Sequence, residues 1–188
     1  MTIDLAVEPT DADLIRWSLR DADRFADVFE RHFADIHRYA ARRLGDATAD
    51  DIAAETFLAA FGQRDRYAPE RGPVRAWLFG IAANLIGRHR RTEVRALRTW
   101  ARAGVDPVTE CHSDEVVDRL SGGLDRRLAG ALAGLAARDR EVLLLVAWGD
   151  LSYEEVAAAL RIPEGTVASR LNRVRRKLRT ALNGETEV

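Results

Sequence analysis

Residues 151–182 contain the side chains best suited to contact nucleic acid. They read LSYEEVAAALRIPEGTVASRLNRVRRKLRTAL. Ser152 and Glu155 fit a capping box at the start of a short helix. Pro163 then interrupts the chain, and a second helix follows that is crowded with arginine. This order of parts is typical of a helix-turn-helix, whose second helix lies in the major groove of DNA.

The second of these helices is predicted to have one buried face and one polar face. Val167, Leu171, Val174 and Leu178 recur at helical spacing and form the buried stripe. Arginine on the polar face suits DNA, because its guanidinium group can clamp a phosphate or a guanine edge. The expected DNA contacts are Thr166, Ser169, Arg170, Asn172, Arg173, Arg176 and Lys177. The alternative is a basic helix that is merely solvated.

Arginine residues gather a second time between residues 64 and 91, around Tyr67 and Trp77. Such a surface suits single-stranded DNA, because bases stack on aromatic rings while guanidinium groups follow the backbone. Asn84 could read a base edge. The expected contacts are Arg64, Arg66, Tyr67, Arg71, Arg75, Asn84, Arg88, Arg90 and Arg91. The alternative places Trp77 in the core and leaves Asn84 solvated; of Trp77 and Phe79, we expect one to be buried.

The charges of the chain are segregated although its net charge is only −1. Net charge is −6 over residues 1–60, +7 over 61–102, −6 over 103–160 and +4 over 161–188. A near-neutral protein can still bind nucleic acid when its basic residues are separated from its acidic ones in this way.

Composition excludes several classes of protein. The 188 residues contain no run of about 18 apolar residues that would span a membrane. The first residues are acidic and do not form a secretory signal. A single cysteine, Cys111, excludes an internal disulfide. These features favour a cytoplasmic protein.

We expect no catalysis, no metal and no cofactor. His32 and His37 are five residues apart, a poor spacing for one helix face, and the Cys111–His112 pair has no second pair for zinc. Two adjacent carboxylates, Asp50 and Asp51, diverge on a helix and suit an interaction surface better than a metal.

The apolar pattern predicts an all-α fold with two small helical domains joined by an acidic flexible linker. We expect a leader over residues 1–20, a first domain over 21–94, the linker over 95–123 and the helix-turn-helix domain over 124–184. Gly104, Pro107, Gly122 and Gly123 punctuate the expected linker.

Three segments together resemble a bacterial RNA polymerase sigma factor of the extracytoplasmic-function (ECF) class. Residues 49–58 (ADDIAAETFL) resemble the helix that binds core polymerase, which is usually close to AEDLVQETFL. Residues 66–91 resemble the segment that recognises and melts the −10 element, and residues 151–178 resemble the −35 reader. Ala54 and Ala83 depart from the family pattern, where glutamine and arginine are common.

This resemblance implies the partners and the division of labour. Core RNA polymerase would hold the first domain on the clamp of its largest subunit and the C-terminal domain on its flap. The loop 64–73 would capture a flipped base of the −10 element, and residues 164–178 would enter the groove at −35. An anti-sigma factor is typical of the family. The expected polymerase contacts are Asp50, Asp51, Glu55, Phe57 and Leu58.

Two other functions compete with this one. A free-standing dimeric regulator would use the same helix-turn-helix but leaves the first basic segment and the acidic linker unexplained. A helical metal-dependent hydrolase would use the histidines, and metal analysis of the purified protein would decide that case.

Overall fold

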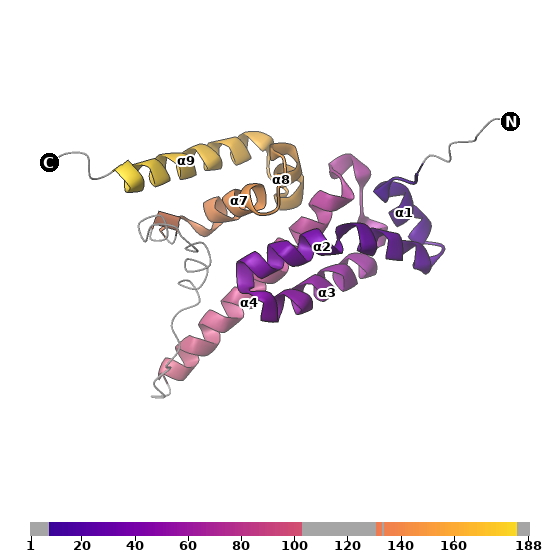
Figure 1. The fold of residues 1–188 in the computed structure, drawn as a ribbon, viewed down its shortest axis with the longest axis horizontal. Helices are drawn as coiled ribbons and strands as arrows, with labels where there is room; N and C mark the ends of the chain where they lie inside the picture. The colour runs from indigo at the N-terminus through magenta and orange to yellow at the C-terminus, as the bar shows by residue number, and fades with distance from the viewer. Residues whose placement is uncertain (1–7, 103–130, 133, 184–188) are drawn as a thin grey trace.

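The computed structural model describes residues 8–102, 131–132 and 134–183, with side chains described over 8–90, 131–132 and 134–180 (Figure 1). Every regular element in these ranges is helical, which confirms the expected all-α fold. The α-helices are α1 (Asp11–Ser18), α2 (Phe25–Leu44), α3 (Asp46–Gly62), α4 (Val74–Arg102), α7 (Ala137–Ala147), α8 (Tyr153–Leu160) and α9 (Glu164–Asn183). None of the described helices is both long and apolar enough to cross a membrane.

The first domain is built on a hairpin of α2 and α3 with α4 packed across both helices. Gly45 makes the turn of this hairpin in a single residue, and its φ of 87° suits glycine. Ile36, Tyr39 and Ile52 lie in the core between these helices, together with Leu78 of α4. Short 3₁₀ turns at Arg64–Arg66 and Pro69–Arg71 connect α3 to α4.

The predicted leader contains an ordered helix, so that prediction was wrong over residues 11–18. Thr10 and Asp13 form a reciprocal capping box at the start of α1. Leu14 and Ile15 are buried in the core, which fastens α1 to α2. The described part of the leader therefore belongs to the first domain.

The predicted linker also begins too early. Helix α4 continues to Arg102, so residues 95–102 are helical. The sequence from residue 92 to residue 102 contains neither glycine nor proline, so nothing in it stops the helix. The rest of the predicted linker, residues 103–123, lies outside the described residues.

The second domain contains the predicted helix-turn-helix in α8 and α9. Ser152 accepts a hydrogen bond from the Glu155 backbone, and Glu155 accepts one from the Ser152 backbone, as the capping box requires. Arg161 ends α8 in the left-handed conformation, with φ of 53°. The stripe on α9 is buried at Val167, Leu171 and Val174.

The two domains pack directly against each other. One continuous cluster of buried side chains runs from Leu14 in α1 to Leu171 in α9, and it includes residues of α2, α3, α4, α7 and α8. Helix α8 lies on the N-terminal half of α4, while α9 runs along the outer edge of the second domain (Figure 1). The sequence pattern predicts two domains but not this contact between them.

Candidate nucleic-acid and partner interfaces

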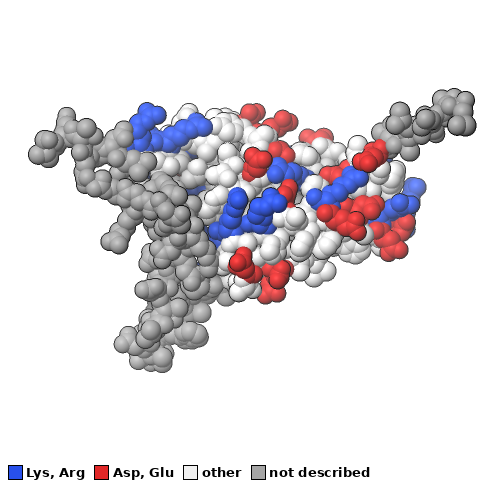
Figure 2. Space-filling model, in the orientation of Figure 1, with Lys and Arg blue, Asp and Glu red and all other residues white. Residues whose placement is uncertain are grey.

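The outer face of α9 is open to solvent. Ser169, Asn172, Arg176 and Lys177 are exposed, while Thr166 and Arg170 are half-buried. Basic side chains gather along the edge of the molecule formed by α9 (Figure 2). An exposed helix face with this composition matches the polar face expected from the sequence, and it can approach DNA without rearrangement of the second domain.

Arg173 has a structural partner that the sequence did not reveal. Its Nη1 donates to both carboxylate oxygens of Asp139, at 2.8 and 3.0 Å. Asp139 is only 2% exposed and lies in the first turn of α7. Arg175, which was not among the predicted contacts, donates to the Tyr153 hydroxyl at 2.8 Å and to Asn172 at 3.3 Å. Arg173 therefore holds α9 on α7, whatever else it contacts.

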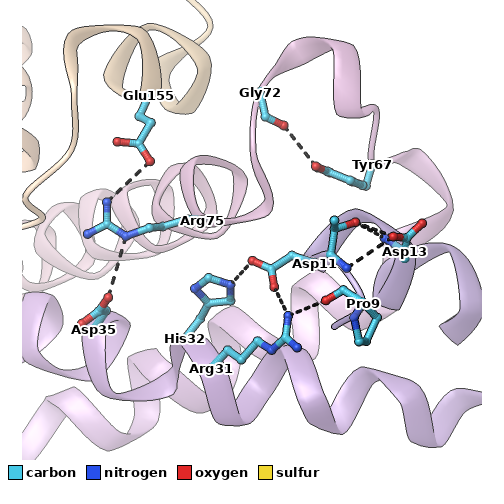
Figure 3. A network of polar contacts seen from close by, with 11 residues as sticks. Pro9, Asp11, Asp13, Arg31, His32, Asp35, Tyr67, Gly72, Arg75 and Glu155 are labelled. Atoms are coloured by element: carbon cyan, nitrogen blue, oxygen red, sulfur yellow. Dashed lines mark hydrogen bonds and ion pairs between the residues drawn. The ribbon is translucent and has the colours of Figure 1, made fainter. Parts of the chain in front are cut away.

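The loop after α3 brings two aromatic rings together. The rings of Tyr67 and Trp77 lie 5.2 Å apart between centroids, and the Tyr67 hydroxyl donates to the Gly72 carbonyl at 3.1 Å (Figure 3). Burial, with the nearby carboxylates of Asp11 and Glu70, raises the pKa of Tyr67, so its ring stays neutral at physiological pH. Phe79 is 1% exposed and Trp77 only partly buried, so one of the pair is core, as expected.

These rings border a cavity of about 550 Å³. Asn84 also lines it, and the cavity walls include arginine but no carboxylate among the described residues. The predicted residues that line it are Arg66, Tyr67, Arg71, Asn84 and Arg88. The lining also includes the end of α8 and its C-cap, residues 158–161, so Arg161 adds a further guanidinium group. Stacking surface, guanidinium groups and an amide therefore meet in one place, as a nucleotide requires.

The predicted arginines of this segment differ in whether their side chains contact other parts of the protein. Arg66 and Arg71 are exposed, and within the described residues their guanidinium groups form no hydrogen bond or ion pair. Arg64 instead donates to the carbonyls of Ser18 and Phe61, which joins α1 to the end of α3. The side chain of Arg91 lies outside the described residues.

Arg75 and Arg90 are also engaged within the protein. Arg75 donates to the carbonyls of Gly149 at 2.7 Å and Asp150 at 3.1 Å, both in the second domain. Arg90 donates to the Arg43 carbonyl at 2.8 Å, and burial lowers its pKa to about 10. Like Arg64, these two side chains are not free to follow a DNA backbone in this conformation.

The expected polymerase-binding helix presents an exposed stripe on α3. Asp50, Asp51 and Glu55 are exposed, and Leu58 is 72% exposed, which is unusual for leucine. Phe57, however, is only 4% exposed and packs edge-on against Phe29. In this structure Phe57 therefore lies in the core beneath this surface, whereas the sequence led us to expect it on the surface.

A buried polar cluster joins the two domains, and it was not expected from the sequence. Arg43 of α2 is 3% exposed at its side chain and makes a bidentate ion pair with Glu141 of α7, at 2.8 and 2.9 Å. Tyr39 donates to the same carboxylate at 2.9 Å. Burial would lower the pKa of Arg43, but Tyr39 and Glu141 outweigh it and raise that pKa. No local signal in the sequence links Arg43 to a residue so far along the chain.

The histidines considered for a metal site have other partners. His32 is hydrogen-bonded to Asp11 at 2.7 Å, and His37 lies 3.0 Å from the Asp50 carboxylate. Asp11 also accepts from Arg31, which ties α1 to α2 (Figure 3). Within the described ranges, no group of three or more histidine, cysteine, aspartate or glutamate side chains is arranged to hold a metal.

Comparison with known proteins agrees with this geometry. Residues 28–96 match the family described as "Sigma-70 region 2", and residues 125–178 match "Sigma-70, region 4". The chain is 36% identical over 157 residues to the ECF RNA polymerase sigma factor SigL of Mycobacterium tuberculosis, covering 82% of this chain and 86% of SigL. The chain belongs to the ECF sigma factors. It directs promoter-specific initiation of transcription, and its partners are core RNA polymerase and promoter DNA.

Two further relatives extend the likeness across both domains. The sigma factor CnrH of Cupriavidus metallidurans is 31% identical over 195 residues, which cover 96% of this chain and all of CnrH. The solved structure of CnrH in complex with the cytosolic domain of CnrY superposes with a TM-score of 0.62 at 25% identity, over 94% of this chain and 99% of the CnrH chain. SigW of Bacillus subtilis is 32% identical, over 86% of this chain and 90% of SigW.

Proposed function

We propose that this sigma factor reads the −35 element with α9 and captures a melted −10 base in the cavity beside Tyr67. The exposed outer face of α9 supports the first role. The second role is supported by the gathering of two aromatic rings, Asn84 and several arginines around one cavity that has no carboxylate in its described lining. This gathering is the observation that carries the proposal.

The proposal can be tested by transcription in vitro. Start sites that change when the protein is overproduced identify its promoters. On such a promoter, core polymerase should give run-off transcript only when the protein is added, and tight promoter binding should require both. Specific binding as a dimer without core polymerase would instead indicate the free-standing regulator.

We assign the exposed stripe of α3 to core polymerase, with Asp51, Glu55 and Leu58 as contacts. The protein has no catalytic activity of its own and works in the cytoplasm. An anti-sigma factor is a further expected partner. The solved structure of CnrH is a complex with the cytosolic domain of CnrY, and that of the sigma factor RpoE from Bartonella quintana is a complex with the anti-sigma factor NepR.

Replacing Arg176 by alanine is expected to weaken −35 recognition. Arg176 is exposed on the outer face of α9, where its backbone carbonyl accepts from Thr180 and its guanidinium forms no ion pair within the described residues. Loss of a bidentate base contact should cost the holoenzyme about 1–3 kcal/mol of promoter binding and relax its preference at one −35 position. Equilibrium binding to promoter duplexes with altered −35 bases measures both effects.

Arg42→Ala is the matched control, because Arg42 is also an exposed arginine on a helix but lies in α2. It should change neither affinity nor sequence preference. Arg173→Ala is a poorer test, because it would also unpair the buried carboxylate of Asp139. Unchanged −35 preference in Arg176→Ala would remove Arg176 from the reading face.

Reversing two charges on α3 is expected to weaken assembly with core polymerase. Both Asp51 and Glu55 are exposed, so Asp51→Arg with Glu55→Arg should leave the helical content and melting temperature close to those of the wild type. Like charges placed across an interface repel, and core affinity should fall on the order of tenfold or more. Titration of labelled protein with core polymerase measures this.

The control reverses two exposed acids elsewhere, Asp23 and Glu154, to arginine. It makes the same change in net charge, so a general electrostatic effect would appear in both variants. Equal core affinity of the two double variants would refute the placement of the polymerase contact on α3.

A further inference from the structure

The indole ring of Trp17, near the end of α1, is partly in solvent. Leu14, Ile15 and Ser18 form the buried face of this helix and are at most 2% exposed. Trp17 is 43% exposed, the most of any tryptophan whose side chain the structure describes. Tryptophan is enriched at interfaces, and its flat face is one on which an unpaired base can stack.

The end of α1 is fastened beside the cavity proposed for the melted −10 base. Arg64 Nε donates to the Ser18 carbonyl at 3.3 Å, and the guanidinium carbon of Arg64 lies 3.8 Å from the centre of the Phe61 ring. The residue before Arg64, Gln63, lines the cavity. Because Trp17 directly precedes Ser18 in the chain, Arg64 holds the indole close to the strand site.

The start of α1 lies beside the same loop. The Asp11 carboxylate is close enough to the Tyr67 hydroxyl that it helps burial to raise the pKa of Tyr67. Figure 3 shows Asp11 and Asp13 below the loop that runs from Tyr67 to Gly72. With both of its ends beside the loop, α1 runs along it and extends the proposed strand site on one side.

The acidic residues of α1 are paired within the chain, so they do not bar a nucleic acid from this surface. The Asp11 carboxylate lies 2.9 Å from the Arg31 guanidinium, and Asp13 pairs with Arg16. Arg20 follows the helix and is exposed, and its guanidinium forms no hydrogen bond or ion pair within the described residues. An aromatic face with an unpaired guanidinium nearby is the combination that binds unpaired bases and their phosphates.

We propose that Trp17 is a second stacking platform for the melted strand, and that Arg20 contacts the phosphate beside the stacked base. A base captured next to Tyr67 belongs to a continuous strand, so a neighbouring unpaired base reaches Trp17 while the first stays in the cavity. The inference rests on the proposed function, because it takes this cavity to hold one base of the strand. It adds a second base contact, on a helix outside the segment that the sequence led us to expect at the −10 element.

An abasic scan with the holoenzyme tests this contact. The probe is a fluorescein-labelled promoter duplex whose −10 region and adjacent bases are already unpaired, with one abasic nucleotide moved along each unpaired strand in turn. An abasic nucleotide keeps the phosphate and removes the base, so it removes stacking alone. Fluorescence anisotropy measures the equilibrium affinity of each sigma variant, assembled with core polymerase, for each probe.

The variants separate an aromatic face from apolar bulk. Trp17→Leu keeps apolar bulk on α1 without a ring, whereas Trp17→Phe keeps a ring. Circular dichroism and the melting temperature check that both remain folded, and Trp17→Met replaces Trp17→Leu if that variant melts early. Leu19→Ala is the matched control, because Leu19 is 50% exposed close to Trp17 and has no ring.

We expect one abasic position to lower the affinity of the wild-type holoenzyme about tenfold, and that of Trp17→Leu hardly at all, because the ring that stacks on that base is already gone. On the intact probe, Trp17→Leu should bind about tenfold more weakly than the wild type, and Trp17→Phe within about threefold of it. Leu19→Ala should bind like the wild type. Arg20→Ala should weaken binding to every probe by a similar factor and reduce its dependence on salt.

A scan in which no position is coupled to Trp17 would overturn the inference. So would weaker binding of Trp17→Leu to core polymerase without DNA, which would assign the ring to the polymerase, or an equal loss in Leu19→Ala, which would make the contact a general apolar one. The same scan with Tyr67→Ala tests the proposed function by itself. A position coupled to Tyr67 with none coupled to Trp17 removes only this inference, whereas the absence of any position coupled to Tyr67 removes the proposed function.

Discussion

Replacing Glu141 by alanine is expected to destabilise the folded protein by about 3–5 kcal/mol. The substitution removes both carboxylate oxygens that pair with the Arg43 guanidinium and one that accepts from the Tyr39 hydroxyl. Arg43 is 3% exposed at its side chain, and its Nε already lacks a hydrogen-bond partner within the described residues. A charge left alone at such a site costs far more than the pair contributes. Urea unfolding followed by circular dichroism measures the loss.

The triple variant Tyr39→Phe, Arg43→Met, Glu141→Leu is the decisive control. It removes the charges together with their partners and keeps similar volume, so it should recover most of the stability. Recovery would show that the cost in Glu141→Ala comes from the stranded guanidinium. If Glu141→Ala proves as stable as the wild type, Arg43 reaches water in that variant, which would mean that the domains separate at little cost.

The helix-turn-helix was predictable because its signals are local. The capping box of Ser152 and Glu155 and the spacing of Val167, Leu171 and Val174 all lie within one short segment. Each constrains only its own helix, and the structure contains all of them. The same reasoning explains why the all-α class followed from the apolar pattern, whereas that pattern left open which of Trp77 and Phe79 is buried.

Two differences between the expected and the observed elements trace to local signals in the sequence. Thr10 and Asp13 have the spacing of a capping box and come directly before the apolar residues Leu14 and Ile15. Helix α1 could therefore have been predicted from the sequence. Composition changes near residue 94, where the linker was expected to begin, but nothing between residues 92 and 102 breaks a helix. A change in composition is therefore weaker evidence for a helix end than a glycine or a proline.

The contact between the domains could not be predicted from local pattern. Arg43 and Arg75 look like ordinary surface arginines on amphipathic helices, and only the fold brings them to Glu141 and to the Gly149 carbonyl. The local pattern makes every arginine between residues 64 and 91 look equally available to DNA. Long-range packing engages Arg64, Arg75 and Arg90 in contacts within the protein.

Replacing Tyr67 by alanine is expected to reduce open-complex formation strongly on a duplex promoter. A base stacked on an aromatic ring contributes about 1–3 kcal/mol, and this free energy offsets the cost of opening the −10 base pairs. The Tyr67 ring lines the cavity and is held at a centroid distance of 5.2 Å from Trp77. Run-off transcription should fall on the order of tenfold to a hundredfold, as that range of energies implies.

Transcription from a second template, with an unpaired −10 region, shows which step the loss of the Tyr67 ring affects. On a promoter whose −10 region is already unpaired, no base pairs need to be opened, and the defect of Tyr67→Ala should shrink. Tyr67→Phe keeps the ring and removes only the 3.1 Å hydrogen bond to the Gly72 carbonyl, so it should retain most of the activity on both templates. An equal defect of Tyr67→Ala on paired and unpaired templates would move the residue from strand capture to assembly with polymerase. Because the loop that carries Tyr67 also meets α8 through Gly72, a Tyr67→Ala chain with unchanged distances between its domains would separate loss of stacking from loss of docking.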